Sequence, residues 1–261
     1  MDRYALFFDI DGTLVSFETH EIPASTIFAL TQAKANGHRV YIATGRPLPI
    51  ITNLGAIEHL VDGYMTTNGA YCFVGKKTVC MSPIEKKDVD YVLADAVRND
   101  YACIVSSETE FVVFNPKEYV DRIFRRQLAV EKLDLAKPVD HALSEKILQL
   151  SPFFSEKHEQ ELMSRLPDCV SGRWHPEFTD ITSRLADKGI GLASIAKYEG
   201  FDLQHTIAFG DGGNDLSMIR RAGVGVAMGN ALESVKSAAD YTTTSVDEEG
   251  IRRALEHFNI I

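Results

Sequence analysis

Two aspartates directly after a short apolar run are the feature that most constrains this fold. The run Tyr4–Phe8 is typical of a buried central strand in a parallel sheet, and Asp9, Ile10, Asp11 and Gly12 follow it. Because side chains alternate along a strand, Asp9 and Asp11 are expected to project to the same side. Two such carboxylates are costly to bury unless a cation lies between them. An ordinary Asp-Gly turn is the alternative, and a calcium loop fits less well because it needs its glycine later.

A second strand, Arg39–Ala43, leads directly into Thr44, Gly45, Arg46 and a proline. These residues are suited to begin a helix, because Thr44 can cap it and proline fits its first turn. The same arrangement would present a hydroxyl and free N–H groups to an anion, so both uses stay open. The amphipathic segment 23–37 between the two strands is predicted to be a helix. Strand and helix alternating in this way predict a right-handed parallel α/β sheet.

The pattern changes in the middle of the chain, where we predict a second domain. Between residues 82 and 183 the expected strands come in pairs, which is typical of an α+β unit with an antiparallel sheet and helices on one face. We therefore predict an α/β core domain formed by residues 1–81 and 184–261, and an inserted α+β domain formed by residues 82–183. In the insertion we expect helices at 83–98, 116–128 and 155–165 and strands at 102–106, 111–114, 146–150, 169–174 and 178–182.

Alternating elements are expected again in the last part of the chain. We predict helices at 189–198, 216–222 and 250–258, and strands at 206–209, 223–228 and 239–242. The strand 206–209 is followed by the acidic, glycine-rich segment Gly210–Asp215, although such turns are also common in ordinary loops. Parallel strands bring their carboxyl ends to one edge, where Lys188 at the return into the core would add a positive charge. The residues expected to converge there are Asp9, Asp11, Thr44, Asn68 and Asp211.

Composition excludes several classes of partner. The net charge of −10 argues against a nucleic-acid-binding protein, which normally carries a basic patch. Without a signal peptide or an apolar stretch of roughly 18 residues, we expect a cytoplasmic protein without a membrane partner. The cysteines show no close pair of metal-ligand type, and we expect small buried residues in a reducing cytosol. They are Cys72, Cys80, Cys103 and Cys169.

In this order, the motifs resemble those of the haloacid dehalogenase superfamily. The segment Asp9–Thr13 is similar to its first motif, Thr44–Arg46 to its second, Lys188 to its third and Gly210–Asp215 to its fourth. The resemblance implies a Rossmann-like parallel-sheet core. All four motifs in one chain are far more specific than the first motif alone.

The long insertion resembles the type IIB cap of the Cof-like sugar phosphatases. The segments Asn68–Ala70 and Gly229–Ala231 are also similar to that subgroup, and the closest likeness is to bacterial hexose phosphate phosphatases. Where the subgroup has a glycine three residues before its lysine and a Glu-Ile pair ending its cap, this chain has Leu185 and Asp180-Ile181. This departure bears on substrate recognition and leaves the four motifs intact.

The resemblance implies a Mg²⁺-dependent phosphatase for small phosphate monoesters, with Asp9 as the nucleophile that forms an aspartyl-phosphate. Asp11 would act as general acid and base. It further implies that Asp9, the main-chain carbonyl of Asp11 and Asp211 hold Mg²⁺, with Asp215 supporting them. The expected phosphate-binding residues are Thr44, Gly45, Lys188 and Asn214.

Substrate selection is expected to involve the cap, with Arg46 and Asp180 as candidate contacts to the leaving group. The expected partner is a small phosphorylated metabolite, and we expect a monomer. One alternative is a sugar phosphomutase of the same superfamily. Others are a receiver-like signalling protein that stores a phosphoaspartate and a metal-dependent binding protein without turnover. Release of free phosphate, rather than an isomerised sugar or a lasting phosphoaspartate, would distinguish the phosphatase.

Overall fold

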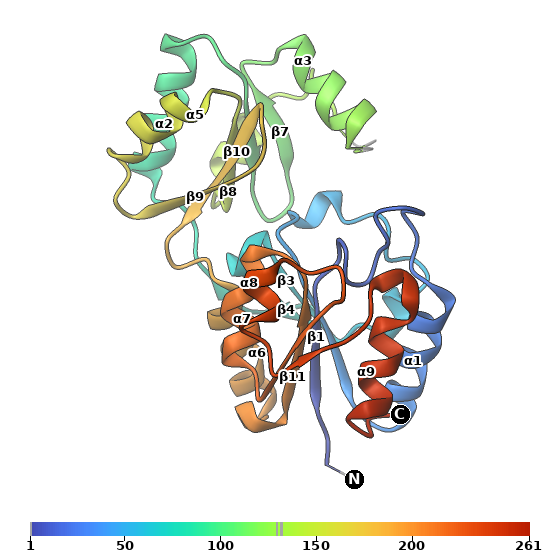
Figure 1. The fold of residues 1–261 in the computed structure, drawn as a ribbon. Helices are drawn as coiled ribbons and strands as arrows, with labels where there is room; N and C mark the ends of the chain where they lie inside the picture. Colours follow the sequence, from blue (N-terminus) through green and yellow to red (C-terminus); the bar gives the residue numbers. More distant parts are fainter. Residues whose placement is uncertain (1, 129, 131–132) are drawn as a thin grey trace. The chain divides into compact units, whose positions relative to one another are not determined.

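The computed structural model describes residues 2–128, 130 and 133–261 (Figure 1). The chain divides into two compact units. The first comprises Met1–Gly45, Thr52–Met81 and Asp187–Ile261, and the second comprises Arg46–Ile51 and Ser82–Ala186. Each unit has its own sheet. In the described part of the chain, no helix combines the length and the apolar character needed to cross a membrane.

The sheet of the first unit is parallel over most of its width. Among the described residues its strand order is β13-β12-β11-β1-β2-β3-β4-β5, with parallel pairing from β13 to β3. Every residue of β1 is buried, as expected for a central strand covered on both faces. The parallel strands are β1 (Ala5–Phe8), β2 (Arg39–Ala43), β3 (Gly63–Thr66), β11 (Thr206–Gly210), β12 (Val224–Ala227) and β13 (Tyr241–Thr242).

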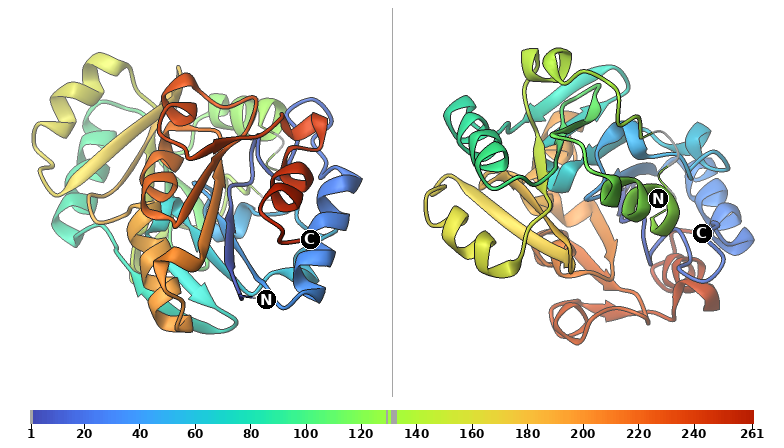
Figure 2. Two further views of the ribbon diagram at one scale, coloured as in Figure 1. Left: turned by 60° about the horizontal axis from the view of Figure 1, so that its bottom comes forward. Right: turned by 90° about the horizontal axis from the view of Figure 1, so that it is seen from above.

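Helices cover both faces of this sheet. The α1 and α9 helices pack side by side on one face, and the group around α6 and α7 lies on the other (Figure 1 and Figure 2). The predicted α/β class is confirmed, and the predicted helices match the observed ones closely. Their bounds are α1 (Ala24–Ala35), α6 (Lys188–Glu199), α7 (Leu216–Arg221), α8 (Glu233–Lys236) and α9 (Gly250–His257).

A hairpin that the sequence reading missed extends the sheet beyond β3. The strands β4 (Tyr71–Val74) and β5 (Lys77–Met81) pair antiparallel with each other, and β4 pairs antiparallel with β3. The turn between them contains Gly75 with a positive φ of 56°. A β-prone run on each side of a glycine turn is a hairpin signal, and it could have been recognised in the sequence. The short helix α8 was also not predicted.

The second unit has an antiparallel sheet with strand order β7-β6-β8-β10-β9 among the described residues. Its strands are β6 (Cys103–Ser106), β7 (Phe111–Phe114), β8 (Gln149–Pro152), β9 (Cys169–His175) and β10 (Phe178–Ser183). Its helices are α2 (Lys86–Arg98), α3 (Glu118–Val120), the π-helical segment η4 (Asp121–Gln127), α4 (Asp140–Ser144) and α5 (Glu156–Met163). The predicted α+β character of this segment is therefore confirmed.

Apolar residues lie on both faces of this second sheet, so the expectation of helices on one face only was wrong. Cys103 and Val105 belong to the core beneath α2 and α5. Ile104 points the other way, into a cluster that includes Val120 of α3 and Phe124 of η4. Because successive strand residues alternate in direction, an unbroken apolar strand such as β6 needs cover on both sides.

Three details of the second unit differ from the expected elements. The helix expected at 116–128 is a short α-helix that continues as η4, and Leu128 closes it by donating to the carbonyl of Ile123. The strand expected at 146–150 is displaced to β8, because Ser106 pairs with Gln149. The helix α4 was not predicted.

The second unit begins at Ser82, where the domain boundary was predicted, but it ends at Ala186 and not at residue 183. Arg184 remains with the second unit, where it donates hydrogen bonds to the carbonyls of Pro167, Asp168 and Cys169. The segment Arg46–Ile51 also groups with the second unit, where Ile50 packs against its apolar cluster.

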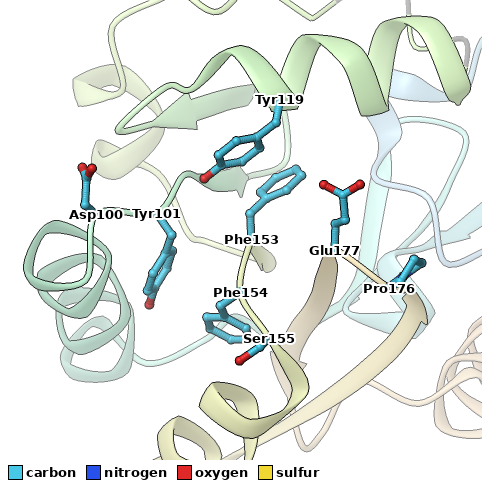
Figure 3. A pocket seen from close by; sticks show the side chains of 8 residues that line it. All are labelled: Asp100, Tyr101, Tyr119, Phe153, Phe154, Ser155, Pro176 and Glu177. Carbon is cyan, nitrogen blue, oxygen red and sulfur yellow. The ribbon is translucent and has the colours of Figure 1, made fainter.

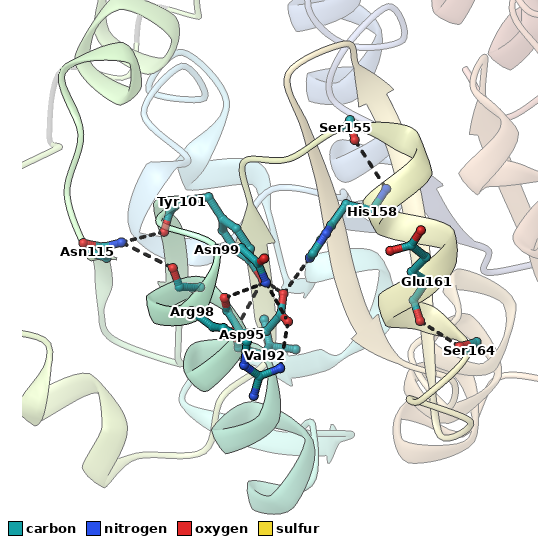
Figure 4. A network of polar contacts seen from close by, with 11 residues as sticks. Val92, Asp95, Arg98, Asn99, Tyr101, Asn115, Ser155, His158, Glu161 and Ser164 are labelled. Carbon is teal, nitrogen blue, oxygen red and sulfur yellow. Dashed lines mark hydrogen bonds and ion pairs between the residues drawn. The ribbon is translucent and has the colours of Figure 1, made fainter.

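A buried carboxylate joins two helices of the second unit. Asp95 of α2 lies 2.6 Å from Nε2 of His158 on α5 and accepts a hydrogen bond of 2.8 Å from Tyr101 (Figure 4). Asn99 donates to its other oxygen. Asp95 is thus a shared partner that fixes α2, α5 and the segment entering β6.

Candidate active site

Asp9 stands where β1 ends, at the carboxyl edge of the parallel sheet. Its N–H donates to the carbonyl of Phe209 on the neighbouring β11, and its side chain is buried. Asp11 follows in a tight turn that is closed by a bridge to Val15. Burial raises the pKa of Asp9, and the neighbouring charge of Asp11 adds to this shift.

Gly12 lets the turn after Asp11 lie directly against the loop that follows β11. Its φ is +79°, and an added Cβ would lie only 2.4 Å from Oδ2 of Asp211. The next residue, Thr13, donates its hydroxyl to Oδ1 of Asp211 at 3.0 Å. A glycine is therefore required here both for the backbone and for the approach of the second acid.

Lys188 links the first and fourth motifs. Its Nζ lies 2.7 Å from Oδ1 of Asp9 and 2.6 Å from Oδ1 of Asp215, and its side chain is fully buried. Lys188 is the first residue of α6, whose N-terminus is capped by the side chain of Asp187. The position of the ammonium group is therefore set by the start of a helix.

Asp215 holds the loop of the fourth motif together. While Oδ1 faces Lys188, Oδ2 accepts hydrogen bonds from the N–H groups of Asp211 and Gly212, at 3.0 and 2.9 Å. Gly210 allows this, because an added Cβ would lie 2.5 Å from the Asp215 side chain. Asp215 thus positions Asp211 through the backbone of the loop.

Burial and mutual repulsion set the protonation of the cluster. Burial raises the pKa of Asp9 well above its usual range, and the ion pair with Lys188 opposes this shift. Burial, followed by the charge of Asp215, raises the pKa of Asp211 to about 7. Burial alone would lower the pKa of Lys188, but the charges of Asp215 and Asp9 outweigh it and raise that pKa. The three carboxylates of Asp9, Asp211 and Asp215 therefore face a single ammonium group, that of Lys188, which cannot balance their charge.

The donor set fits a hard cation. Among the described residues, Asp9, Asp211 and Asp215 each offer a carboxylate oxygen within 4.8 Å of the others. All donors are oxygens, as Mg²⁺ and Ca²⁺ prefer. The carboxylate of Asp215 was expected only to support the ligands, and it does lie in this cluster, but Lys188 and two N–H groups already bind its oxygens. Oδ1 of Asp9 accepts a hydrogen bond from Lys188, and Oδ1 of Asp211 accepts one from Thr13.

Of the two uses left open for Thr44, helix capping is not the one observed. Its N–H donates to the carbonyl of Met65 and its carbonyl accepts from the N–H of Asn68. The helical turn that follows is a short 3₁₀ segment, Leu48–Ile50, with Pro47 at its N-cap. Pairing of β2 with β3 takes the backbone groups of Thr44, so its N–H is not available to an anion.

Gly45 lies beside two amide side chains. An added Cβ would be 3.1 Å from Oδ1 of Asn68 and 3.5 Å from Nδ2 of Asn214. Asn214 donates to Asn68 at 2.9 Å, and it is the residue directly before Asp215. The fold thus brings the second and fourth motifs together, with exposed N–H donors next to the acid cluster.

Two predicted substrate contacts, Arg46 and Asp180, belong to the second unit. Asp180 lies on β10, where its oxygens accept hydrogen bonds from Ser151 Oγ at 2.6 Å and Trp174 Nε1 at 2.7 Å. Burial raises the pKa of Asp180 even though these hydrogen bonds oppose the shift. The Trp174 ring itself is exposed.

Two residues that organise the site lie in motifs named from the sequence, but no role was assigned to them there. Thr13 orients Asp211 through its hydroxyl. Asn230 donates to the carbonyl of Gly12 at 2.8 Å and accepts from the N–H of Val246. Thr13 belongs to the first motif, and Asn230 follows a glycine after a buried strand. Both positions could therefore have been proposed as site residues from the sequence.

A separate cavity of about 350 Å³ lies in the second unit and contains none of the predicted site residues (Figure 3). Four aromatic rings and two acids line much of it. The residues are Asp100, Tyr101, Tyr119, Phe153, Phe154, Ser155, Pro176 and Glu177. Both acids are already paired, Asp100 with Lys117 and Glu177 with Arg122.

Comparison with known proteins gives the same assignment along nearly the whole chain. The sequence profile of the haloacid dehalogenase-like hydrolases matches residues 6–255. A solved structure described as the HAD subclass IIB sugar phosphatase BT4131 is 46% identical, with a TM-score of 0.89, over 99% of this chain and 100% of that one. A structure of the phosphatase BT1666 from Bacteroides thetaiotaomicron is 33% identical, with a TM-score of 0.87, over 99% and 96%.

A curated relative from Bacillus subtilis, named phosphatase YwpJ, is 29% identical over 95% of this chain and 97% of its own length. The profile match includes Asp9, Thr44, Lys188 and Asp211, the residues that stand for the four motifs. Sequence, fold and site geometry therefore agree, and the chain belongs to the haloacid dehalogenase-like hydrolase family.

Proposed function

We propose that this protein is a Mg²⁺-dependent phosphatase that hydrolyses small sugar phosphates, with hexose phosphates as the principal class. The observation that carries the proposal is the buried Lys188, held between Asp9 and Asp215 beside Asp211. The names of the relatives support phosphatase chemistry, and the subclass IIB sugar phosphatase supports the substrate class.

Asp9 is the proposed nucleophile. Its carboxylate attacks phosphorus and forms an aspartyl-phosphate, which divides one difficult displacement into two easier ones. Lys188 fixes the orientation of Asp9 through the 2.7 Å contact and offsets the repulsion between two anions. When bound by Asp9, Asp211 and the main-chain carbonyl of Asp11, Mg²⁺ would supply the remaining positive charge.

Asp11 is the proposed general acid and base. It is partly exposed, so it can exchange protons with solvent, and its charge acts on Asp9. As an acid it would protonate the departing alkoxide, and as a base it would then take a proton from the water that attacks the intermediate.

The phosphate oxygens would be held by donors around the second motif. Gly45, Asn214 and Lys188 remain the proposed contacts, because Asn214 and Asn68 converge on Gly45 beside the acid cluster. For Thr44 the proposal is narrowed to its side chain, since its backbone N–H is used within the sheet.

Recognition of the leaving group is assigned to the second unit. The carboxylate of Asp180 is a fixed hydrogen-bond acceptor next to the exposed ring of Trp174. An acceptor beside an aromatic face suits a polyhydroxyl compound such as a sugar. Arg46, in the segment after the second motif, is the second proposed contact.

A phosphate-release assay tests this function. The purified protein is incubated with hexose 6-phosphates and Mg²⁺, and both free phosphate and sugar isomers are quantified, with Asp9→Asn as the control. We expect free phosphate that depends on Mg²⁺ and is abolished by a chelator and by Asp9→Asn. An isomerised sugar phosphate without phosphate release would instead identify a phosphomutase, and activity that persists in the chelator would refute the metal requirement.

A further inference from the structure

Two free cysteines lie opposite each other on the β4–β5 hairpin. The antiparallel register pairs Cys72 directly with Cys80, just before a shift of register at Phe73, and both are free thiols. Opposed residues on antiparallel strands have Cα atoms about 4.5–5.5 Å apart, within the range of roughly 4.4–6.8 Å that a disulfide spans. The register therefore places Cys72 and Cys80 within the Cα separation that a disulfide spans.

The two thiols differ in a way that suits a reaction between them. Cys72 is fully buried, whereas Cys80 is partly exposed and lies beside Ser194 of α6. The neighbouring Cys72 side chain lowers the pKa of Cys80 to about 7, although burial opposes the shift. Cys80 is thus the accessible thiolate and Cys72 the neighbouring thiol. By contrast, burial raises the pKa of Cys169 to about 11.

We propose that Cys72 and Cys80 form a reversible disulfide when the protein meets a hydroperoxide, and that this bond slows turnover at the Asp9 site. The Cys80 thiolate attacks the peroxide oxygen and breaks the O–O bond, giving a sulfenic acid and hydroxide. The Cys72 sulfur then displaces hydroxide from the sulfenic sulfur, and its proton leaves with that hydroxide as water. With the proton that Cys80 released on forming its thiolate, the hydroxide of the first step also becomes water, so two thiols are oxidised to the disulfide while one hydrogen peroxide is reduced to two waters.

The hairpin touches the backbone that positions Lys188. The thiol of Cys72 donates to the carbonyl of Gly69 at 3.7 Å. Gly69 packs so closely on Asp187 that an added Cβ would lie 2.5 Å from its carbonyl oxygen. An added Cβ on Gly191, in the first turn of α6, would lie 3.0 Å from the Cys72 sulfur. Moving that sulfur toward Cys80 changes the contacts beneath the turn that begins with Lys188.

Peptide mapping tests the bond without reference to activity. Trypsin cleaves after Lys76 and Lys77, so Cys72 and Cys80 end up on different peptides, which only a disulfide keeps joined. After exposure to hydrogen peroxide, blocking of free thiols with iodoacetamide and digestion without reductant, we expect the joined pair, and dithiothreitol should separate it. If both peptides are recovered only as alkylated or over-oxidised species, the proposal is wrong. Cys103 and Cys169, in the second unit, serve as internal controls.

Turnover tests the consequence, and this part rests on the proposed function. Displacement of a reacting group by roughly 1 Å can cost about 10²-fold in rate, so we expect peroxide to lower hydrolysis of p-nitrophenyl phosphate by up to about 10²-fold. Dithiothreitol should restore it. Cys80→Ser should keep its activity in peroxide, whereas the control Cys169→Ser should lose activity like the parent.

Three outcomes separate the parts of the proposal. Equal inactivation of Cys80→Ser and the parent would refute the link to turnover, as would a joined peptide pair with unchanged rate. Absence of any phosphatase activity before oxidation would refute the proposed function, while the peptide map would still decide whether the disulfide forms.

Discussion

At the scale of single residues, the chemistry depends on acids whose surroundings differ. Asp9 and Asp215 are buried against one ammonium group, whereas Asp11 is partly exposed. The sequence was sufficient to place Asp9, Lys188 and Asp211 together, because Asp9 and Asp211 follow strands of a parallel sheet and Lys188 lies where the chain returns to the core. It was not sufficient to show that the oxygens of Asp215 are divided between Lys188 and two backbone N–H groups, because that depends on the path of the loop.

Asp11→Asn separates the two chemical steps. The amide keeps the shape and the main-chain carbonyl but cannot transfer a proton, which is typically worth about 10²–10⁴-fold in rate. Hydrolysis of hexose 6-phosphates should fall by that factor. With acetyl phosphate, whose leaving group needs little protonation, the variant should accumulate phosphate on Asp9, seen as added mass after a rapid acid quench. Asp9→Asn should accumulate none, and unchanged turnover by Asp11→Asn would show that Asp11 is only a turn residue.

Gly12→Ala tests the close approach of the first and fourth motifs. Both Gly12 and Gly37 have a positive φ, +79° and +89°, but only at Gly12 would a Cβ meet Asp211, while nothing lies within 4 Å at Gly37. Gly37→Ala should therefore lower the free energy of unfolding by only about 1–2 kcal/mol, the cost of a left-handed backbone conformation in a residue with a Cβ. Gly12→Ala should lower it more, and should also lose activity. Urea denaturation and phosphate release measure the two effects, and equal stability losses with full activity would contradict the steric contact.

At the scale of elements, the parallel strands and their helices were predictable, and the irregular segments were not. The alternation of buried strands and helices is a local signal, so the bounds of β2 and α6 followed from it. The capping role left open for Thr44 is not seen, because the next helical turn begins only at Leu48, with Pro47 at its N-cap. The nearness of Cys72 to Cys80 was missed for a different reason, since the local turn signal of the β4–β5 hairpin was present in the sequence but was not recognised.

The pairing of α2 with α5 should make the second unit sensitive to acid. Burial raises the pKa of Asp95, but hydrogen bonds from His158 and Tyr101 outweigh it, so the net shift is downward. A carboxyl with a lowered folded pKa contributes stability above its unfolded pKa of about 3.9, and this contribution is lost as the pH falls through the folded value. Urea unfolding followed by the fluorescence of Trp174, the single tryptophan, measures it.

We expect the urea midpoint to fall between pH 7 and about pH 3, and Asp95→Asn to be less stable at pH 7 with a smaller fall. Asp90→Asn, on the exposed surface of the same helix, is the matched control and should behave like the parent. An Asp95→Asn midpoint that falls as steeply as that of the parent would assign the acid sensitivity to other groups.

At the scale of the whole molecule, the proposed chemistry and the proposed selectivity belong to different units. Asp180→Ala should therefore change the order of preference among sugar phosphates more than it changes the hydrolysis of p-nitrophenyl phosphate, whose leaving group lacks hydroxyls. The measurement is kcat/KM for each substrate, with the exposed Asp90→Ala as control. A uniform loss for all substrates would mean that Asp180 stabilises the sheet and does not select.

The position of β1 has a consequence for synthesis on the ribosome. One neighbour of β1 is β2, but the other, β11, begins only at Thr206, after the whole insertion has been translated. At about 5–20 residues per second, the roughly 125 residues from the end of β5 to β11 take on the order of 6–25 s. During that interval the nascent chain carries an apolar strand with one edge unpaired, and the second unit is complete only once Ala186 has been translated, shortly before β11. Early capture of that edge, by a chaperone or by another nascent chain, would decide the yield of folded enzyme.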